Sequence, residues 1–236
     1  MNSTELAYGL SAAAANVCGA LAVTWRREWS VRVLDRTLAF AAGFLLSVAF
    51  VDLIPEAIAR GGQQAAIVAL VSYLLVHLTQ HTLGRHFHFG EETHRVTRIV
   101  SVSALIGLLL HTFVDGVAVA SGIMVSSAVG ALVFMGVLLH KFPEGLAISS
   151  LFLAAGARRS TAIAAAGAIG AATLLGVALT EQFSGLRTNG LAISAGVTIY
   201  VGASNLVPEF QARSGWGTPV SFMAGCGAYF ATRALL

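Results

Sequence analysis

Charged side chains are scarce in this sequence of 236 residues. Asp, Glu, Lys and Arg together make up 11% of the chain, whereas 56% of the residues are hydrophobic and the mean hydropathy is +0.79. Soluble domains carry roughly 25% charged residues. The deficit excludes an ordinary soluble domain and predicts a protein that lies in a lipid bilayer.

Cysteine and lysine are rarer still. The two cysteines, Cys18 and Cys226, stand far apart with no paired spacing, which excludes a disulfide framework or a thiolate metal site of the usual spacing. We expect both thiols to be packed between helices. Lys141 is the only lysine in the chain.

Long apolar segments fill most of the sequence. A helix needs about 20 mostly apolar residues to cross the roughly 30 Å hydrocarbon core of a bilayer. The sequence therefore predicts an all-α polytopic membrane protein, a single domain over residues 1–236. Its eight transmembrane helices lie at about 6–25, 37–59, 65–84, 99–123, 128–154, 161–182, 188–211 and 217–235.

The arginines follow the connections between these segments. They collect between the first and second, the third and fourth, and the fifth and sixth segments, and only three lie in the remaining connections and ends. By the positive-inside rule the Arg-rich connections face the cytoplasm, including the loop at about 85–98, and both termini lie outside. The net charge of +3 thus reflects topology, and we expect no nucleic-acid partner.

An internal repeat links the second and seventh segments. A shift of 153 residues places "AGFLLSVAFVDLIPEAIARGG" from Ala42 over "AGVTIYVGASNLVPEFQARSG" from Ala195. These helices run in opposite directions, so the pattern predicts an inverted repeat, helices 1–3 and 6–8 around helices 4–5, as in many transporters. Chance similarity between two Ala/Gly-rich helices is the alternative interpretation.

Two histidine–carboxylate pairs stand inside the fourth and fifth segments, in "HTFVDG" and "HKFPEG". At a spacing of four residues, His111 and Asp115 share one helix face, as do His140 and Glu144. Ionisable groups in mid-bilayer are costly and usually mark an ion or proton path. Two imidazoles and two carboxylates suit Zn²⁺, Fe²⁺ or Mn²⁺, so these four residues are the predicted ligands of one divalent metal ion.

The neighbours of these pairs fit the same interpretation. Pro143 removes a helical hydrogen bond near the site, and Gly116 and Gly145 keep space for a neighbouring helix. Lys141 is expected to act as an internal counter-charge paired with Asp115, Glu144 or Asp52, which favours one bound metal rather than two.

The two motifs resemble those of the ZIP (Zrt-, Irt-like protein) divalent-metal transporter family. Its fourth helix carries a His-Asn-x-x-Asp/Glu-Gly-like motif and its fifth a His-x-x-Pro-Glu-Gly-like one. The resemblance implies that His111, Asp115, His140 and Glu144 bind the primary metal. Ligands of a second site would fall at Thr112, Lys141 and Thr173, and these departures put a binuclear centre in doubt.

The resemblance also implies inward transport of a divalent ion, with Zn²⁺ as the main candidate and Fe²⁺, Mn²⁺ or Cd²⁺ as alternatives, and no cofactor beyond the transported metal. It implies elevator-like motion and a homodimer in the bilayer. Asp52 would lie on the metal's access route, and His86, His88 and His94 form a His-containing loop. High Ala and Arg with short loops hint at a bacterial inner membrane.

Two other function classes are open. An intramembrane metalloenzyme would carry His-Glu-x-x-His on one helix, and this motif is missing, so we expect no enzyme. A proton-coupled carrier of a small organic solute would use the same acids as a relay, and would need a larger cavity and an anchoring Arg or aromatic group.

Overall fold

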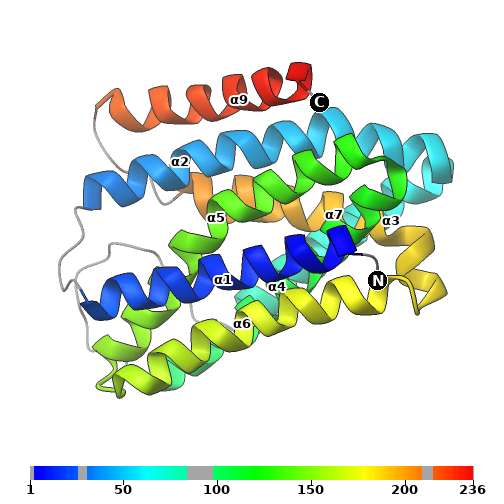
Figure 1. Ribbon diagram of the computed structural model, residues 1–236. Coiled ribbons are helices and arrows are strands. Elements are labelled where there is room, and N and C mark those ends of the chain that lie inside the picture. Colours follow the sequence, from blue (N-terminus) through cyan, green and yellow to red (C-terminus); the bar gives the residue numbers. More distant parts are fainter. Residues whose placement is uncertain (1–2, 26–30, 84–97, 209–214, 236) are drawn as a thin grey trace.

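The computed structural model of the chain describes residues 3–25, 31–83, 98–208 and 215–235, and these ranges contain helices and no strand. The all-α prediction is therefore confirmed for the described residues (Figure 1). The loop predicted at 85–98, with His86, His88 and His94, lies almost entirely outside them. The elements are α1 (Ser3–Trp25), α2 (Val31–Val48), η1 (Ala49–Leu53), α3 (Ile54–Leu83), α4 (Arg98–Val125), α5 (Ser127–Ala154), α6 (Arg159–Thr180), α7 (Ser184–Ile199), η2 (Tyr200–Leu206) and α9 (Gly217–Leu235).

Five helical stretches among the described residues are long and apolar enough to cross a membrane: Ser3–Trp25, Asp35–Thr79, Ser101–Val125, Ser127–Ala154 and Arg159–Thr180. The protein is accordingly an integral membrane protein. The second stretch has 45 residues, which at 1.5 Å per residue is roughly 68 Å and more than twice the hydrocarbon thickness. Gly62 breaks it with φ 57° and ψ −147°, a conformation that glycine adopts at little cost.

The helices pack in two groups. One group contains α1, α4, α5 and α6; in the other, α2 lies against α9 and α3 against α7. The groups meet where α2 packs on α5 and where α4 packs on α7. Figure 1 shows α9 and α2 along one side of the bundle and α6 along the other, with α5 and α1 between them. Helices α4 and α5, which belong to the first group, therefore make its main contacts with the second.

Close helix crossings flank both carboxylates of the predicted site. A Cβ atom on Gly145 of α5 would overlap the backbone carbonyl of Asn16 in α1, and a Cβ atom on Gly116 of α4 would overlap the carbonyl of Thr173 in α6. The prediction that these two glycines make room for neighbouring helices is confirmed. Small residues allow such backbone contact in lipid, where van der Waals packing drives helix association.

Two π-helical segments, η1 and η2, continue α2 and α7. The shift of 153 residues found in the sequence superposes 49–53 on 202–206, within these segments. A π-helical turn holds an extra residue and often occurs at functional sites. Here η1 places Asp52 in the protein interior, with 7% of its surface exposed.

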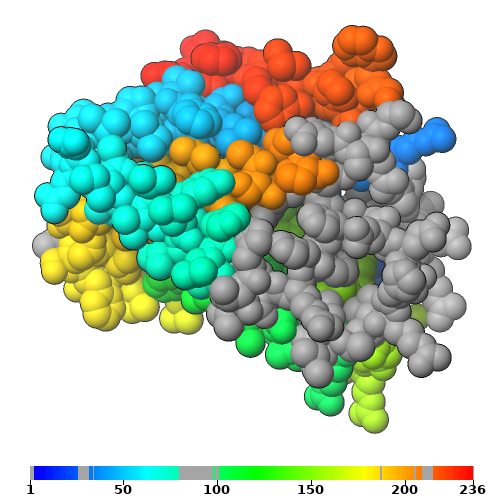
Figure 2. Space-filling model, turned by 180° about the vertical axis from the view of Figure 1, so that it is seen from behind, coloured from blue at the N-terminus to red at the C-terminus, as the bar shows by residue number. Residues whose placement is uncertain are grey.

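The outer surface of α3 carries a continuous apolar row. Its members are spaced by three and four residues and are each about half exposed: Ile67, Leu70, Val71, Leu74, Leu75 and Leu78. Figure 2 shows the face of the molecule that α3 forms beside α7, with α9 above. Such a face suits a hydrocarbon environment.

The cysteines only partly follow the prediction. Cys226 is partly buried, and its thiol donates to the carbonyl of Gly43 at 3.5 Å. Cys18 is exposed on α1, so the expectation that it is packed was wrong. Cysteine is apolar enough to occupy an outward position on a helix that lies in lipid.

The crossing at Gly145 predicts a mutational effect. Gly145→Ala should lower the melting temperature of the purified protein in detergent by roughly 2–12 °C, because overpacking against the backbone of Asn16 costs about 1–3 kcal/mol. Gly167→Ala is the matched control, because a Cβ atom at Gly167 meets nothing within 4 Å. Equal melting temperatures for the two variants would show that α1 and α5 do not cross here.

Candidate metal site between α4 and α5

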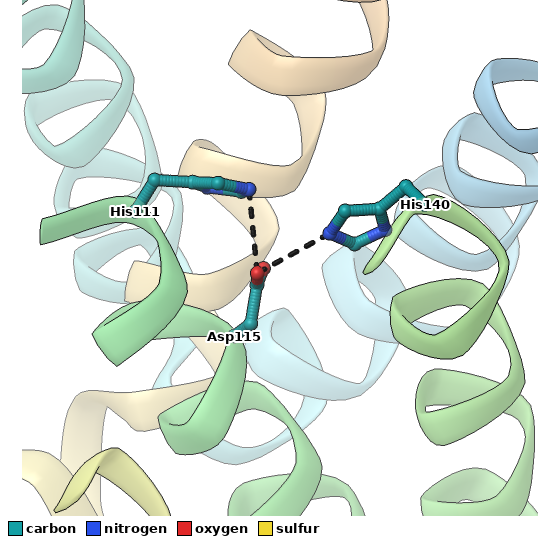
Figure 3. A group of neighbouring side chains, drawn as sticks. All are labelled: His111, Asp115 and His140. Atoms are coloured by element: carbon teal, nitrogen blue, oxygen red, sulfur yellow. Dashed lines mark hydrogen bonds and ion pairs between the residues drawn. The ribbon is translucent and has the colours of Figure 1, made fainter. Parts of the chain in front are cut away.

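Helices α4 and α5 bring together two histidines and one carboxylate that could hold a metal ion. The potential ligand atoms of His111, Asp115 and His140 all lie within 4.8 Å of one another, and all three residues are buried. His111 and Asp115 lie one helical turn apart on α4, and His140 faces them from α5 (Figure 3). The helical spacing of four therefore does place the first pair on one face.

One oxygen atom, Oδ2 of Asp115, is the point where these residues converge. Nε2 of His111 lies 3.3 Å from it and Nε2 of His140 lies 3.2 Å from it. Two donor atoms that bind one tetrahedral zinc ion at about 2.1 Å are about 3.4 Å from each other. Each imidazole nitrogen therefore lies at about the distance from Oδ2 that separates two ligands of one zinc ion.

A hydrogen bond to the backbone of α5 fixes the orientation of the His140 ring. Its Nδ1 lies 2.9 Å from the carbonyl oxygen of Gly136; because a carbonyl only accepts, Nδ1 donates there. In the neutral ring, Nε2 then carries a lone pair, and this lone pair points at the Asp115 carboxylate. Two acceptors that face each other at 3.2 Å need a proton or a cation between them. Metal-ligating histidines commonly donate their second nitrogen in this way.

Glu144 lies at the edge of this group. Its Oε1 is 3.8 Å from Nε2 of His111 and is a buried atom with no hydrogen-bond partner among the described residues. Its side chain is 7% exposed. A buried carboxylate oxygen without a donor is costly, so Oε1 is available as a further ligand with only a small movement. The structure thus brings all four predicted ligands to one place.

Lys141 holds the two carboxylates together. Its ammonium is fully buried and donates to Oδ2 of Asp115 at 2.5 Å and to Oε2 of Glu144 at 2.8 Å. Asp115 and Glu144 are two of the partners expected from the sequence. Buried charges persist only when they are paired and hydrogen-bonded. Lys141 therefore supplies a permanent positive charge beside the place where a metal ion would bind.

The other predicted positions do not reach the histidines. Thr112 and Thr173 are fully buried, but each hydroxyl donates to a carbonyl of its own helix, Leu109 and Ile169 respectively. Asp52 accepts a hydrogen bond from the Tyr229 hydroxyl at 2.6 Å and lies 3.5 Å from the Arg233 guanidinium. Its carboxylate is therefore engaged with α9.

Sequence reasoning missed two features near these groups. The partners of Asp52 are 177 or more residues away in the chain, and no local pattern indicates them. The second is Asn16, which is fully buried with both side-chain polar atoms unpartnered among the described residues. The sequence feature that could have indicated Asn16 is its position as the single amide within the apolar run "SAAAANVCGA".

The buried ion pairs predict an effect on stability. Metal-free Lys141→Met should melt roughly 6–20 °C below the wild-type protein, because breaking a buried pair leaves uncompensated charge at a cost of about 3–5 kcal/mol. Arg60→Met is the control, because the Arg60–Glu56 pair is largely exposed and such pairs contribute little. Thermal unfolding in detergent measures both, and equal losses would contradict the assigned pairing.

Comparison with protein families gives one match. Residues 86–230, more than half of the chain, match the family model described as "ZIP Zinc transporter". The matched region contains all the residues that converge on Asp115. No curated protein sequence matches the chain significantly.

Proposed function

The chain belongs to the ZIP zinc transporter family, and on that premise we propose that it carries divalent transition-metal ions across the membrane through His111, Asp115, His140 and Glu144. The family consists of metal-ion transporters, not enzymes. The observation that carries the proposal is the convergence of two imidazole Nε2 atoms on Oδ2 of Asp115 at 3.2 and 3.3 Å.

Zn²⁺ is the ion that the geometry favours. The donor set contains only imidazole nitrogen and carboxylate oxygen, which suits Zn²⁺ and also admits Fe²⁺, Mn²⁺ or Cd²⁺. The distance of each imidazole nitrogen from Oδ2 of Asp115, 3.2 or 3.3 Å, fits a tetrahedral shell. Each of the four ligand residues has a side chain 7% exposed or less, which favours a dehydrated ion over an organic solute.

Eight membrane crossings with an inverted repeat account best for the fold. Gly62 divides the longest apolar stretch into two helices of membrane length. Packing of α1 on α5 has its counterpart in α6 on α4, and packing of α2 on α9 has its counterpart in α7 on α3. Both η1 and η2 fall at matching positions. Moreover, α1 begins and α9 ends at the same end of the bundle (Figure 1), as an even number of crossings requires.

The two packing groups suggest how the ion moves. A site in α4 and α5 is carried by one group, and relative motion of the other group would expose it to either side, which is alternating access. The Arg-rich connections orient the protein with both termini outside and inward release of the ion. We also propose that the protein lies in a bacterial inner membrane and forms a homodimer.

The site is proposed to hold one metal ion. The Lys141 ammonium already neutralises part of the charge of Asp115 and Glu144 and stands where a second cation would bind. A second divalent ion beside this ammonium would face like-charge repulsion, which is strong in a low-dielectric interior. Thr112 and Thr173, each bonded to its own helix, offer no anionic ligand.

Transport should depend on the imidazoles of the site. Proteoliposomes containing the wild-type protein should take up Zn²⁺, and His111→Ala or His140→Ala should reduce the uptake rate at least tenfold, because each removes a ligand. His77→Ala is the control, since His77 packs beside Tyr73 and Tyr200 in a separate cluster. Wild-type vesicles that take up no transition metal would refute the proposal.

The number of bound metal ions tests the role assigned to Lys141. Purified wild-type protein equilibrated with Zn²⁺ should hold one ion per chain by elemental analysis. Lys141→Asp replaces the internal cation by a ligand, so this variant should hold two. Two ions in the wild-type protein would contradict the counter-charge assignment.

A further inference from the structure

The side-chain amide of Asn16 on α1 is buried without a hydrogen bond to the described residues. Its residue is fully buried, and neither Oδ1 nor Nδ2 has a hydrogen-bond partner among the described residues. Helical position does not force this, because Asn189 on α7 donates from Nδ2 to the carbonyl of Gly185 at 3.3 Å. An unpaired amide in the interior lowers the stability of the fold. Its retention at Asn16 suggests a functional role that involves nearby groups.

Asn16 lies against the part of α5 that carries the lysine of the metal site. Its backbone touches α5 at Gly145, and Lys141 shares a face of α5 with Gly145 because the two are four residues apart. Helices α1 and α5 run in the same direction (Figure 1). Since helical side chains lean toward the N-terminus, the Asn16 amide leans from the level of Gly145 toward that of Lys141.

The hydrogen-bond inventory of Lys141 is incomplete in a way that Asn16 can satisfy. An ammonium has three donors, and the described residues give it two acceptors, one oxygen each of Asp115 and Glu144. The same Asp115 oxygen is the point where both imidazoles converge. A metal ion that binds there competes with the ammonium for this atom.

We propose that Asn16 is a positioning residue whose Oδ1 accepts the Lys141 ammonium when a metal ion takes over Asp115, an inference that rests on the proposed function. The amide oxygen is neutral, so it can hold the ammonium without adding a charge. Asn16 thereby lowers the cost of displacing Lys141 and raises metal affinity without touching the metal.

The test is a double-mutant cycle on Zn²⁺ affinity, measured with full-length protein in detergent by competition with a chromophoric chelator. Asn16→Leu keeps the size of the side chain but removes the acceptor, and should weaken Zn²⁺ binding about tenfold. In a Lys141→Met background the same substitution should change affinity less than about twofold, because no ammonium remains to be accommodated.

Two further variants serve as controls. Asn16→Ala repeats the cycle in case the leucine disturbs the crossing at Gly145, and Asn189→Leu on α7 should leave affinity unchanged. Stability separates this role from a structural one: Asn16→Leu removes an unpaired amide, so the metal-free variant should melt no lower than the wild-type protein.

Two results would overturn the inference. An equal loss of affinity with and without Lys141 would make Asn16 a direct ligand or a general structural residue. If Zn²⁺ affinity fell in neither background, Asn16 would have no part in metal binding. Both results presuppose that wild-type protein binds Zn²⁺; failure of that binding is instead a failure of the proposed function.

Discussion

A single carboxylate oxygen, Oδ2 of Asp115, is shared by three nitrogen atoms in the interior of the bundle. The ammonium of Lys141 and the two imidazoles of His111 and His140 all lie within 3.3 Å of it. In a low-dielectric interior this negative charge must be compensated at all times. The Lys141 ammonium pairs with this oxygen, and a divalent ion between the imidazoles would compete for the same atom. On the proposed function, metal capture is an exchange of cations on one oxygen.

Helix packing is what keeps these groups together. The glycines that follow the two carboxylates, Gly116 and Gly145, let α6 and α1 approach α4 and α5 to backbone contact. The carboxylates are thereby held between closely crossing helices. Because α4 also contacts α7 and α5 also contacts α2, the site lies where the two helix groups meet, the place from which a relative movement of the groups could open it.

Much of this could be predicted from the sequence because the relevant patterns are local. The spacing of four residues puts His111 with Asp115 on one helix face, and a glycine after each carboxylate indicates a close crossing. Apolar length marks the helices, and the boundary predicted between 59 and 65 contains Gly62, which breaks the long stretch. The eight crossings and their orientation remain predictions.

Contacts that no local pattern indicates could not be predicted. The carboxylate of Asp52 pairs with Tyr229 and Arg233 on the last helix, and only the packing of α2 on α9 reveals this. The choice of Lys141 between three acids likewise depends on the rotation of α4 against α5. Asn16 became notable only when its burial and lack of partners were known.

X-ray absorption at the zinc edge of the loaded, purified protein tests the central claim most directly. The account predicts a first shell of nitrogen and oxygen at about 2.0–2.1 Å with the outer-shell scattering of two imidazoles and no neighbouring metal. The imidazole scattering should fall by half in His140→Ala. A shell that contains sulfur, a shell of oxygen alone, or a second zinc within 4 Å would contradict the assignment of His111, Asp115 and His140 as the ligands of one ion.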